Sequence, residues 1–170
     1  MILGMSLSSF TLFHVVLSLI GIAAGFVVVF GTLASKTLRG WTALFLITTI
    51  LTSVTGYFFP ADKVLPSHIV GAISLVVLAL AVAALYRYRL TGPWRWIYVV
   101  TAFSALYLNV FVGVVQAFLK VSWLQPLAPM QAEPPFVIAQ GVVLLAFVAL
   151  TVVALRGFHP QVHVVSPRAA

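Results

Sequence analysis

Five long apolar segments, separated by short polar gaps, dominate the pattern of hydrophobic and polar positions along the chain. A helix needs about 20 mainly apolar residues to cross the hydrocarbon core of a bilayer, and each segment approaches that length. The pattern therefore predicts an all-α, polytopic transmembrane bundle that forms a single domain over residues 1–170. Its five spans are expected at about 10–33, 41–59, 67–86, 96–119 and 136–155.

The first segment carries a polar and small-residue face. His14, Ser18, Gly21 and Gly25 follow the i, i+4, i+7, i+11 spacing that puts side chains on one side of a helix. Gly21 and Gly25 also form a GxxxG pair, which lets another helix approach closely. That helix can belong to the same chain, to a second copy in a homo-oligomer, or to a partner subunit of a membrane complex.

Similar faces recur in the next three segments. The second carries a hydroxyl stripe, the third begins with small polar residues beside His68, and the fourth has the most polar face of all. In chain order their members are Thr48, Thr52 and Thr55; Ser67, His68, Gly71 and Ser74; and Asn109, Gly113, Gln116 and Lys120. Such groups are costly in lipid, so we expect all these faces to point into the bundle.

Two connecting segments hold both acids of the chain. Residues 57–71 form a bridge between the second and third spans, with Asp62 beside Lys63. Residues 120–135 are rich in proline and contain Glu133, and they are too apolar for a free linker. We expect this second segment to fold over one end of the bundle, with Glu133 either completing a metal site or clamping Lys63 or Lys120.

The distribution of basic residues predicts the orientation. One set of alternate gaps contains seven, namely Lys36, Arg39, Arg87, Arg89, Arg95, Arg156 and Arg168, whereas the other contains Lys63 and Lys120. Lys and Arg accumulate in cytoplasmic loops. The N-terminus is therefore expected outside and the C-terminus in the cytoplasm, which puts His14, Asp62, His68, Lys120 and Glu133 near the outer leaflet.

Composition excludes several classes of function. The chain is 63% hydrophobic and 6% charged, with a mean hydropathy of +1.20, so it has too few charges to cover a soluble surface. Its net charge of +7 sits in the gaps that set topology, so the expected partner is membrane lipid and not nucleic acid. Without cysteine there is no thiolate chemistry, and no catalytic triad or phosphate-binding loop is recognisable. We assign no catalytic residue.

His14 and His68 are the candidate centre of a site. Each lies about one turn inside its span from the same membrane surface, so the two rings can lie at similar depth. Two such imidazoles can bind haem b or, with Asp62 or Glu133, a divalent metal, and Asn109, Gln116 or Lys120 can contact the polar edge of a ligand. The alternative is that each residue only makes hydrogen bonds inside the bundle. Pro160 argues against a helical metal pair of His159 and His163.

Three stretches of the chain resemble known proteins. Residues 94–118 (WRWIYVVTAFSALYLNVFVGVVQAF), 127–145 (LAPMQAEPPFVIAQGVVLL) and 65–80 (LPSHIVGAISLVVLAL) are similar to a group of small, functionally uncharacterised inner-membrane proteins of bacteria. The resemblance implies a multi-pass protein of the bacterial inner (cytoplasmic) membrane and assigns no functional residue. The histidines near helix ends are also arranged similarly to those of small membrane b-type cytochromes.

Two hypotheses follow from the sequence. The first is a membrane protein with a polar ligand or cofactor site in the outer leaflet, holding haem b or a metal in a redox role. The second is a small channel, carrier or accessory subunit of a membrane complex without a cofactor.

Overall fold

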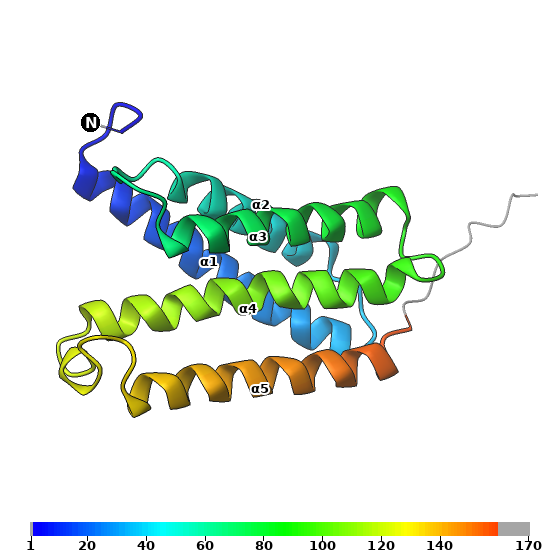
Figure 1. The fold of residues 1–170 in the computed structure, drawn as a ribbon. Helices are drawn as coiled ribbons and strands as arrows, with labels where there is room; N and C mark the ends of the chain where they lie inside the picture. Colours follow the sequence, from blue (N-terminus) through cyan, green and yellow to red (C-terminus); the bar gives the residue numbers. More distant parts are fainter. Residues whose placement is uncertain (1, 160–170) are drawn as a thin grey trace, which may run out of the picture.

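The computed structural model describes residues 2–159, and this part of the chain is helical, with no strand. Five helices run alternately up and down (Figure 1): α1 (Leu7–Leu33), α2 (Arg39–Gly56), α3 (Pro66–Val82), α4 (Trp94–Lys120) and α5 (Pro134–Gly157). A π-helical turn, η1 (Ala83–Arg87), continues α3, and a short 3₁₀ helix, η2 (Gln125–Leu127), follows α4. The all-α prediction is confirmed. The predicted roles of His163 and Arg168 lie outside the described residues.

Four of the helices close a ring. α1 packs against α2 and α4, and α3 packs against the same two helices from the opposite side. α5 lies outside this ring along α4, with a smaller contact to α1 (Figure 1). The middle of the ring is filled by fully buried apolar side chains, among them Phe45, Leu78, Phe103 and Leu106.

By length and composition, α1, α3 with η1, α4 and α5 can cross a membrane. α2 does not reach the same mean hydropathy, because Arg39 and five threonines lie among its 18 residues. The outer surface of the bundle is strongly apolar. On α5 alone, exposed apolar residues include Val137, Ile138, Val142, Leu145, Val148 and Val153. An apolar surface of this extent is typical of contact with lipid or with another protein.

Most helix boundaries differ from the predicted spans by one to four residues, and two of these differences have a clear local cause. α2 ends at Gly56 instead of Phe59, because Pro60 disfavours a helical conformation of the residue before it. The rings of Tyr57 and Phe59 are thereby freed to pack on His68 and His14. α5 begins at Pro134, because the first turn of a helix tolerates the missing N–H of proline.

The charged residues divide between the two ends of the bundle. We call the end that holds residues 2–6, 57–65 and 121–133 the N-terminal end, and the end that holds residues 34–38 and 88–93 the basic end. Lys36, Arg39, Arg87, Arg89, Arg95 and Arg156 lie at the basic end, whereas Asp62, Lys63, Lys120 and Glu133 lie at the N-terminal end. The bundle is therefore electrically asymmetric along its length.

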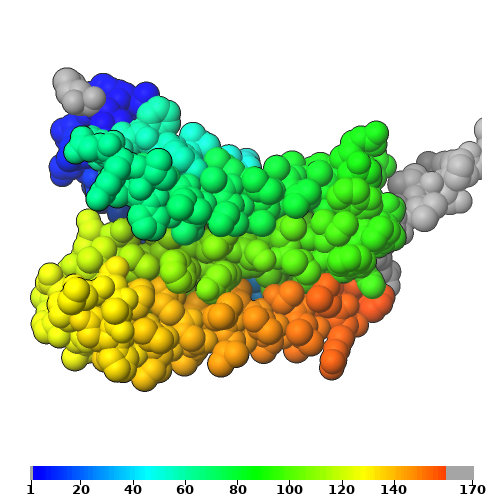
Figure 2. All heavy atoms as spheres, viewed as in Figure 1, coloured from blue at the N-terminus to red at the C-terminus, as the bar shows by residue number. Residues whose placement is uncertain are grey.

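Residues 121–133 fold back on the N-terminal end. Ala128 is buried, and the Gln131 side chain donates a hydrogen bond to the carbonyl oxygen of Val115 on α4 (3.0 Å). Figure 2 shows the segment, in yellow, closing that end of α4 and α5.

Candidate functional site

A small polar cavity lies among the four helices of the ring, in the half nearer the N-terminal end. Its volume is about 100 Å³. Eight of its lining side chains are polar, and every helix of the ring contributes at least one. Those that carry the argument are His14, Ser18, Thr49, Thr52, Ser74 and Asn109.

Gly21 explains how α1 and α2 can meet so closely at this cavity. A Cβ atom at Gly21 would lie 3.0 Å from Oγ1 of Thr49 and 3.2 Å from Nδ2 of Asn109. Both distances are tighter than ordinary van der Waals contact. The GxxxG pair therefore serves packing within the chain, and its first glycine brings polar atoms of three helices together.

The cavity contains both satisfied and unsatisfied polar groups. The Ser18 hydroxyl donates to Oδ1 of Asn109 (2.9 Å), and the Ser53 hydroxyl donates to that of Ser74 (3.1 Å). Among the described residues, Oγ1 of Thr49, Oγ1 of Thr52 and Nδ2 of Asn109 are buried and have no hydrogen-bond partner. Each such atom costs about 1–3 kcal/mol if it stays dry, so the cavity favours water or a polar ligand.

His14 is the one ionisable group that lines this cavity. Its Nδ1 lies 2.8 Å from Oγ1 of Thr55, and the Thr55 hydroxyl lies 2.7 Å from the carbonyl oxygen of Leu51. A hydroxyl has only one proton, so when Thr55 donates it to Leu51 the neutral imidazole carries its own proton on Nδ1. Nε2 of His14 is then left with a lone pair.

His68 lies in different surroundings and does not line the cavity. Its ring stacks on Tyr57 at 5.4 Å, and its Nδ1 accepts a hydrogen bond from the backbone N–H of Leu65 (3.2 Å). The Tyr57 hydroxyl donates to the carbonyl oxygen of His68 (2.7 Å). Each histidine thus has its own protein partners, and the geometry gives the shared haem or metal no support. That hypothesis stays a prediction.

The other predicted site residues are spread over the N-terminal end. Of the fourth polar face only Asn109 lines the cavity, while Gln116 and Lys120 are exposed farther along α4. Asp62 is exposed in its loop. Within residues 2–159, no group of three His, Asp or Glu side chains could hold a metal ion.

Glu133 caps its own loop. Its carboxylate accepts hydrogen bonds from the backbone N–H groups of Met130 (3.1 Å) and Ala132 (3.0 Å). Desolvation works to raise the pKa of Glu133, but the surrounding backbone N–H groups outweigh it and hold this pKa below its ordinary value. These contacts take the place of the predicted clamp on a lysine.

An apolar layer closes the cavity toward the basic end. One turn of α1 beyond Gly21, a Cβ atom at Gly25 would lie 2.5 Å from Leu106 and 3.0 Å from Phe45. Leu106, Phe45 and Leu78 are all fully buried. The surroundings of α1 therefore change from polar to apolar within four residues, and the cavity ends there.

Sequence reasoning missed Thr49 and Ser53. Of the predicted stripe on α2, Thr52 lines the cavity and Thr55 contacts His14, whereas the hydroxyl of Thr48 bonds to the carbonyl oxygen of Leu44 on its own helix. Thr49 and Ser53, outside that stripe, also line the cavity. The density of hydroxyl residues along residues 48–55 was the available signal. It could not distinguish two overlapping faces that differ by one residue.

No protein-family model, curated protein or solved structure matches this chain. The fold and the cavity define a class, an antiparallel helical bundle with a membrane-type apolar surface and a small polar cavity inside it.

Proposed function

We propose that this chain is an integral protein of the bacterial inner membrane that binds a small polar ligand in the outer half of its bundle. The observation that carries the proposal is the cavity among α1, α2, α3 and α4, where three buried polar atoms have no partner among the described residues. Buried polar groups in lipid are expensive unless they meet partners. A bundle that keeps several of them around one cavity is therefore suited to bind something polar there.

The proposed topology has five spans, with the N-terminus outside. α2 is included because it lies between α1 and α3 and runs the height of the bundle, about 27 Å at 1.5 Å per residue. Four of its threonines, Thr42, Thr48, Thr49 and Thr55, are buried inside the bundle, so its low hydropathy does not expose these hydroxyls to lipid. The basic end then faces the cytoplasm, as the positive-inside rule requires.

The size and chemistry of the cavity define the class of ligand. One water molecule needs at least ~10–15 Å³, and sites for drug-sized ligands have about 300–1,000 Å³, so about 100 Å³ fits a few waters or a molecule of a few heavy atoms. Hydroxyl and amide groups line it, and His14 is its one ionisable group. We therefore propose a small uncharged polar molecule. A haem macrocycle is too large for this cavity.

The second candidate function is a carrier. The apolar layer of Phe45, Leu78 and Leu106 closes the cavity toward the basic end, which favours a binding site or one state of a carrier over an open channel. Transport would require this layer to open while the N-terminal end closes.

Cysteine labelling tests whether the cavity is aqueous, because the chain contains no cysteine of its own. The test variant is Ser53→Cys, in the cavity. The controls are Leu78→Cys, in the apolar layer, and Ile138→Cys, on the outer face of α5. Methyl methanethiosulfonate, which is small and uncharged and reacts with thiols in contact with water, should modify Ser53→Cys much faster than either control. An unreactive Ser53→Cys in a folded protein would contradict the proposal.

The orientation is tested separately. Ala61→Cys lies at the N-terminal end and Thr91→Cys at the basic end. We expect a membrane-impermeant methanethiosulfonate, added outside, to label Ala61→Cys in intact spheroplasts and Thr91→Cys only after permeabilisation. The reverse pattern would overturn the topology while leaving the cavity in place.

A further inference from the structure

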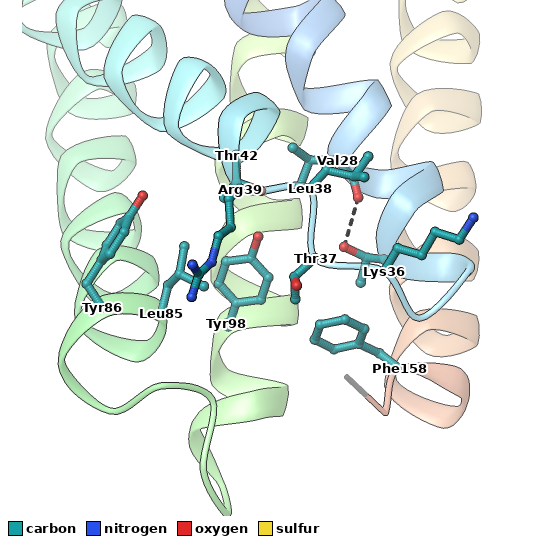
Figure 3. A pocket seen from close by; sticks show the side chains of 11 residues that line it. Val28, Lys36, Thr37, Leu38, Arg39, Thr42, Leu85, Tyr86, Tyr98 and Phe158 are labelled. Carbon is teal, nitrogen blue, oxygen red and sulfur yellow. Dashed lines mark hydrogen bonds between the residues drawn. The ribbon is translucent and has the colours of Figure 1, made fainter. Parts of the chain in front are cut away.

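A second and larger cavity lies at the basic end, on the other side of the apolar layer. Its volume is about 330 Å³, within the range of ligand sites. Five parts of the chain line it: α1, the α1–α2 loop, α2, η1 and α4, with Phe158 after α5 adding a further wall (Figure 3). None of the sequence-based site hypotheses includes it.

The α1–α2 loop that forms one wall is held in a defined conformation. Ser35 has a left-handed backbone conformation (φ 54°), and the N–H of Lys36 donates a hydrogen bond to the carbonyl oxygen of Gly31 (2.8 Å). The Ser35 hydroxyl donates a hydrogen bond to the carbonyl oxygen of Gly157 (2.7 Å). A Cβ atom at Gly31 would lie 2.7 Å from Leu38. The loop therefore folds tightly onto α1 and fixes where α2 begins.

The opposite wall is formed where α3 changes into a π-helical turn. Leu85 and Tyr86 of η1 line the cavity. Single π-helical turns of this kind occur often at functional sites. Here the turn presents one apolar and one hydroxyl-bearing side chain to the cavity.

Arg39 is the charged group that points into the cavity. Figure 3 shows its guanidinium between Leu85 and Tyr98, whereas the Lys36 ammonium at the rim points away. Both carboxylates of the described residues, Asp62 and Glu133, lie at the N-terminal end. Arg39 therefore has no carboxylate partner within residues 2–159. A guanidinium group that points into a cavity can make two parallel hydrogen bonds to a phosphate or a carboxylate.

Hydrogen-bond donors surround the same space. Tyr98 and Thr42 line the cavity, and their side chains are only 3% and 4% exposed. The first turn of α2 has no side-chain cap at Leu38, so its orphan N–H groups add positive potential at this end. Val28, Leu38, Leu85 and Phe158 supply apolar walls.

We propose that this cavity binds the phosphate group of an anionic membrane lipid. The cavity lies at the helix ends, where lipid headgroups meet a bundle in a bilayer, and its walls are apolar around a single guanidinium and several hydroxyls. Basic pockets between transmembrane helices bind such headgroups. A free phosphate shares the charge and the acceptors but does not use the apolar walls. The proposal does not depend on the polar cavity or on which end faces the cytoplasm.

Binding to delipidated protein in detergent tests the proposal. The probes are dioleoylphosphatidylglycerol, dioleoylphosphatidylcholine and inorganic phosphate, with affinity measured by native mass spectrometry or the shift in melting temperature. Wild type should prefer phosphatidylglycerol. Arg39→Gln should bind it about tenfold or more weakly, because a hydrogen bond to a charged group is lost. Arg156→Gln is the matched control, since Arg156 is a basic-end residue that does not line the cavity.

Tyr98→Phe removes one hydroxyl while keeping the ring, so it tests the site even if Arg39→Gln fails to fold. It should weaken phosphatidylglycerol binding by about fivefold. Equal losses in Arg39→Gln and Arg156→Gln, equal binding of both lipids, or an unchanged affinity in Tyr98→Phe would overturn the site. Inorganic phosphate binding as tightly as the lipid would overturn the lipid source.

Discussion

Replacing Gly25 by alanine is expected to destabilise the bundle, because there is no room for one more carbon atom at that position. The new Cβ would lie 2.5 Å from Leu106 and 3.0 Å from two ring atoms of Phe45. Leu106 is 0% exposed and Phe45 is 1% exposed, so neither can move into open space. Overpacking of this kind costs about 1–3 kcal/mol.

Gly141→Ala is the matched control. A Cβ atom there has no neighbour within 4 Å, while both substitutions gain the same helix propensity, worth about 1 kcal/mol. The propensity cancels between the two variants, so Gly25→Ala should be less stable than Gly141→Ala by about 1–3 kcal/mol. Unfolding in dodecylmaltoside with added dodecyl sulfate, followed by circular dichroism, measures the difference. Equal stability of the two variants would refute the close approach of α1 to α2 and α4, and with it the apolar floor of the polar cavity.

Three further predictions concern the site residues. Asn109→Leu should slow labelling of Ser53→Cys about tenfold, because the larger apolar side chain fills the cavity. It removes the unpartnered Nδ2 but also the acceptor of the Ser18 hydroxyl, so these two effects offset each other in part and the unfolding free energy should change by no more than about 1–2 kcal/mol; a larger loss of stability would indicate a structural role instead. The purified protein is expected to have no Soret band, because His14 and His68 have separate partners; a band abolished in both His14→Ala and His68→Ala would restore the shared haem. The pKa of Glu133 is lowered on folding, so its contribution to stability is present above the ordinary value of 4.5 and is lost as the pH falls through the lower folded value. The melting temperature of wild type should accordingly exceed that of Glu133→Gln at neutral pH, and this difference should shrink below about pH 4.5; a difference independent of pH would contradict the capping role.

The positions of the helices were predictable because long apolar segments have to be placed either in the interior of the protein or in the hydrocarbon core of a membrane. Helix starts followed local chemistry, as the prolines before α3 and α5 illustrate. The end of α2 was misjudged because the aromatic residues 57–59 continue its apolar character, and the effect of Pro60 on the residue before it was not taken into account.

The site residues were predictable only in part. The spacing of His14, Ser18 and Gly21 indicated a face that points inward, and that face does line the polar cavity or its edge. Placing His14 and His68 at similar depth was reasonable from span lengths, but depth does not specify rotation about the helix axis. The rotation of α1 about its axis places His14 in the wall of the cavity, and that of α3 stacks His68 on Tyr57.

The sequence by itself determined the class of fold and the charge difference between the two ends, because both depend on which residues follow one another along the chain. The tertiary structure decided which polar faces meet, since this depends on helix rotation and on contacts between distant segments. It brought Thr49 to Asn109 across Gly21, and it turned Arg39 into a cavity with Tyr98, 59 positions farther along. Neither juxtaposition has a local signature, because the groups involved come from separate helices, and only the packing of those helices fixes their distance.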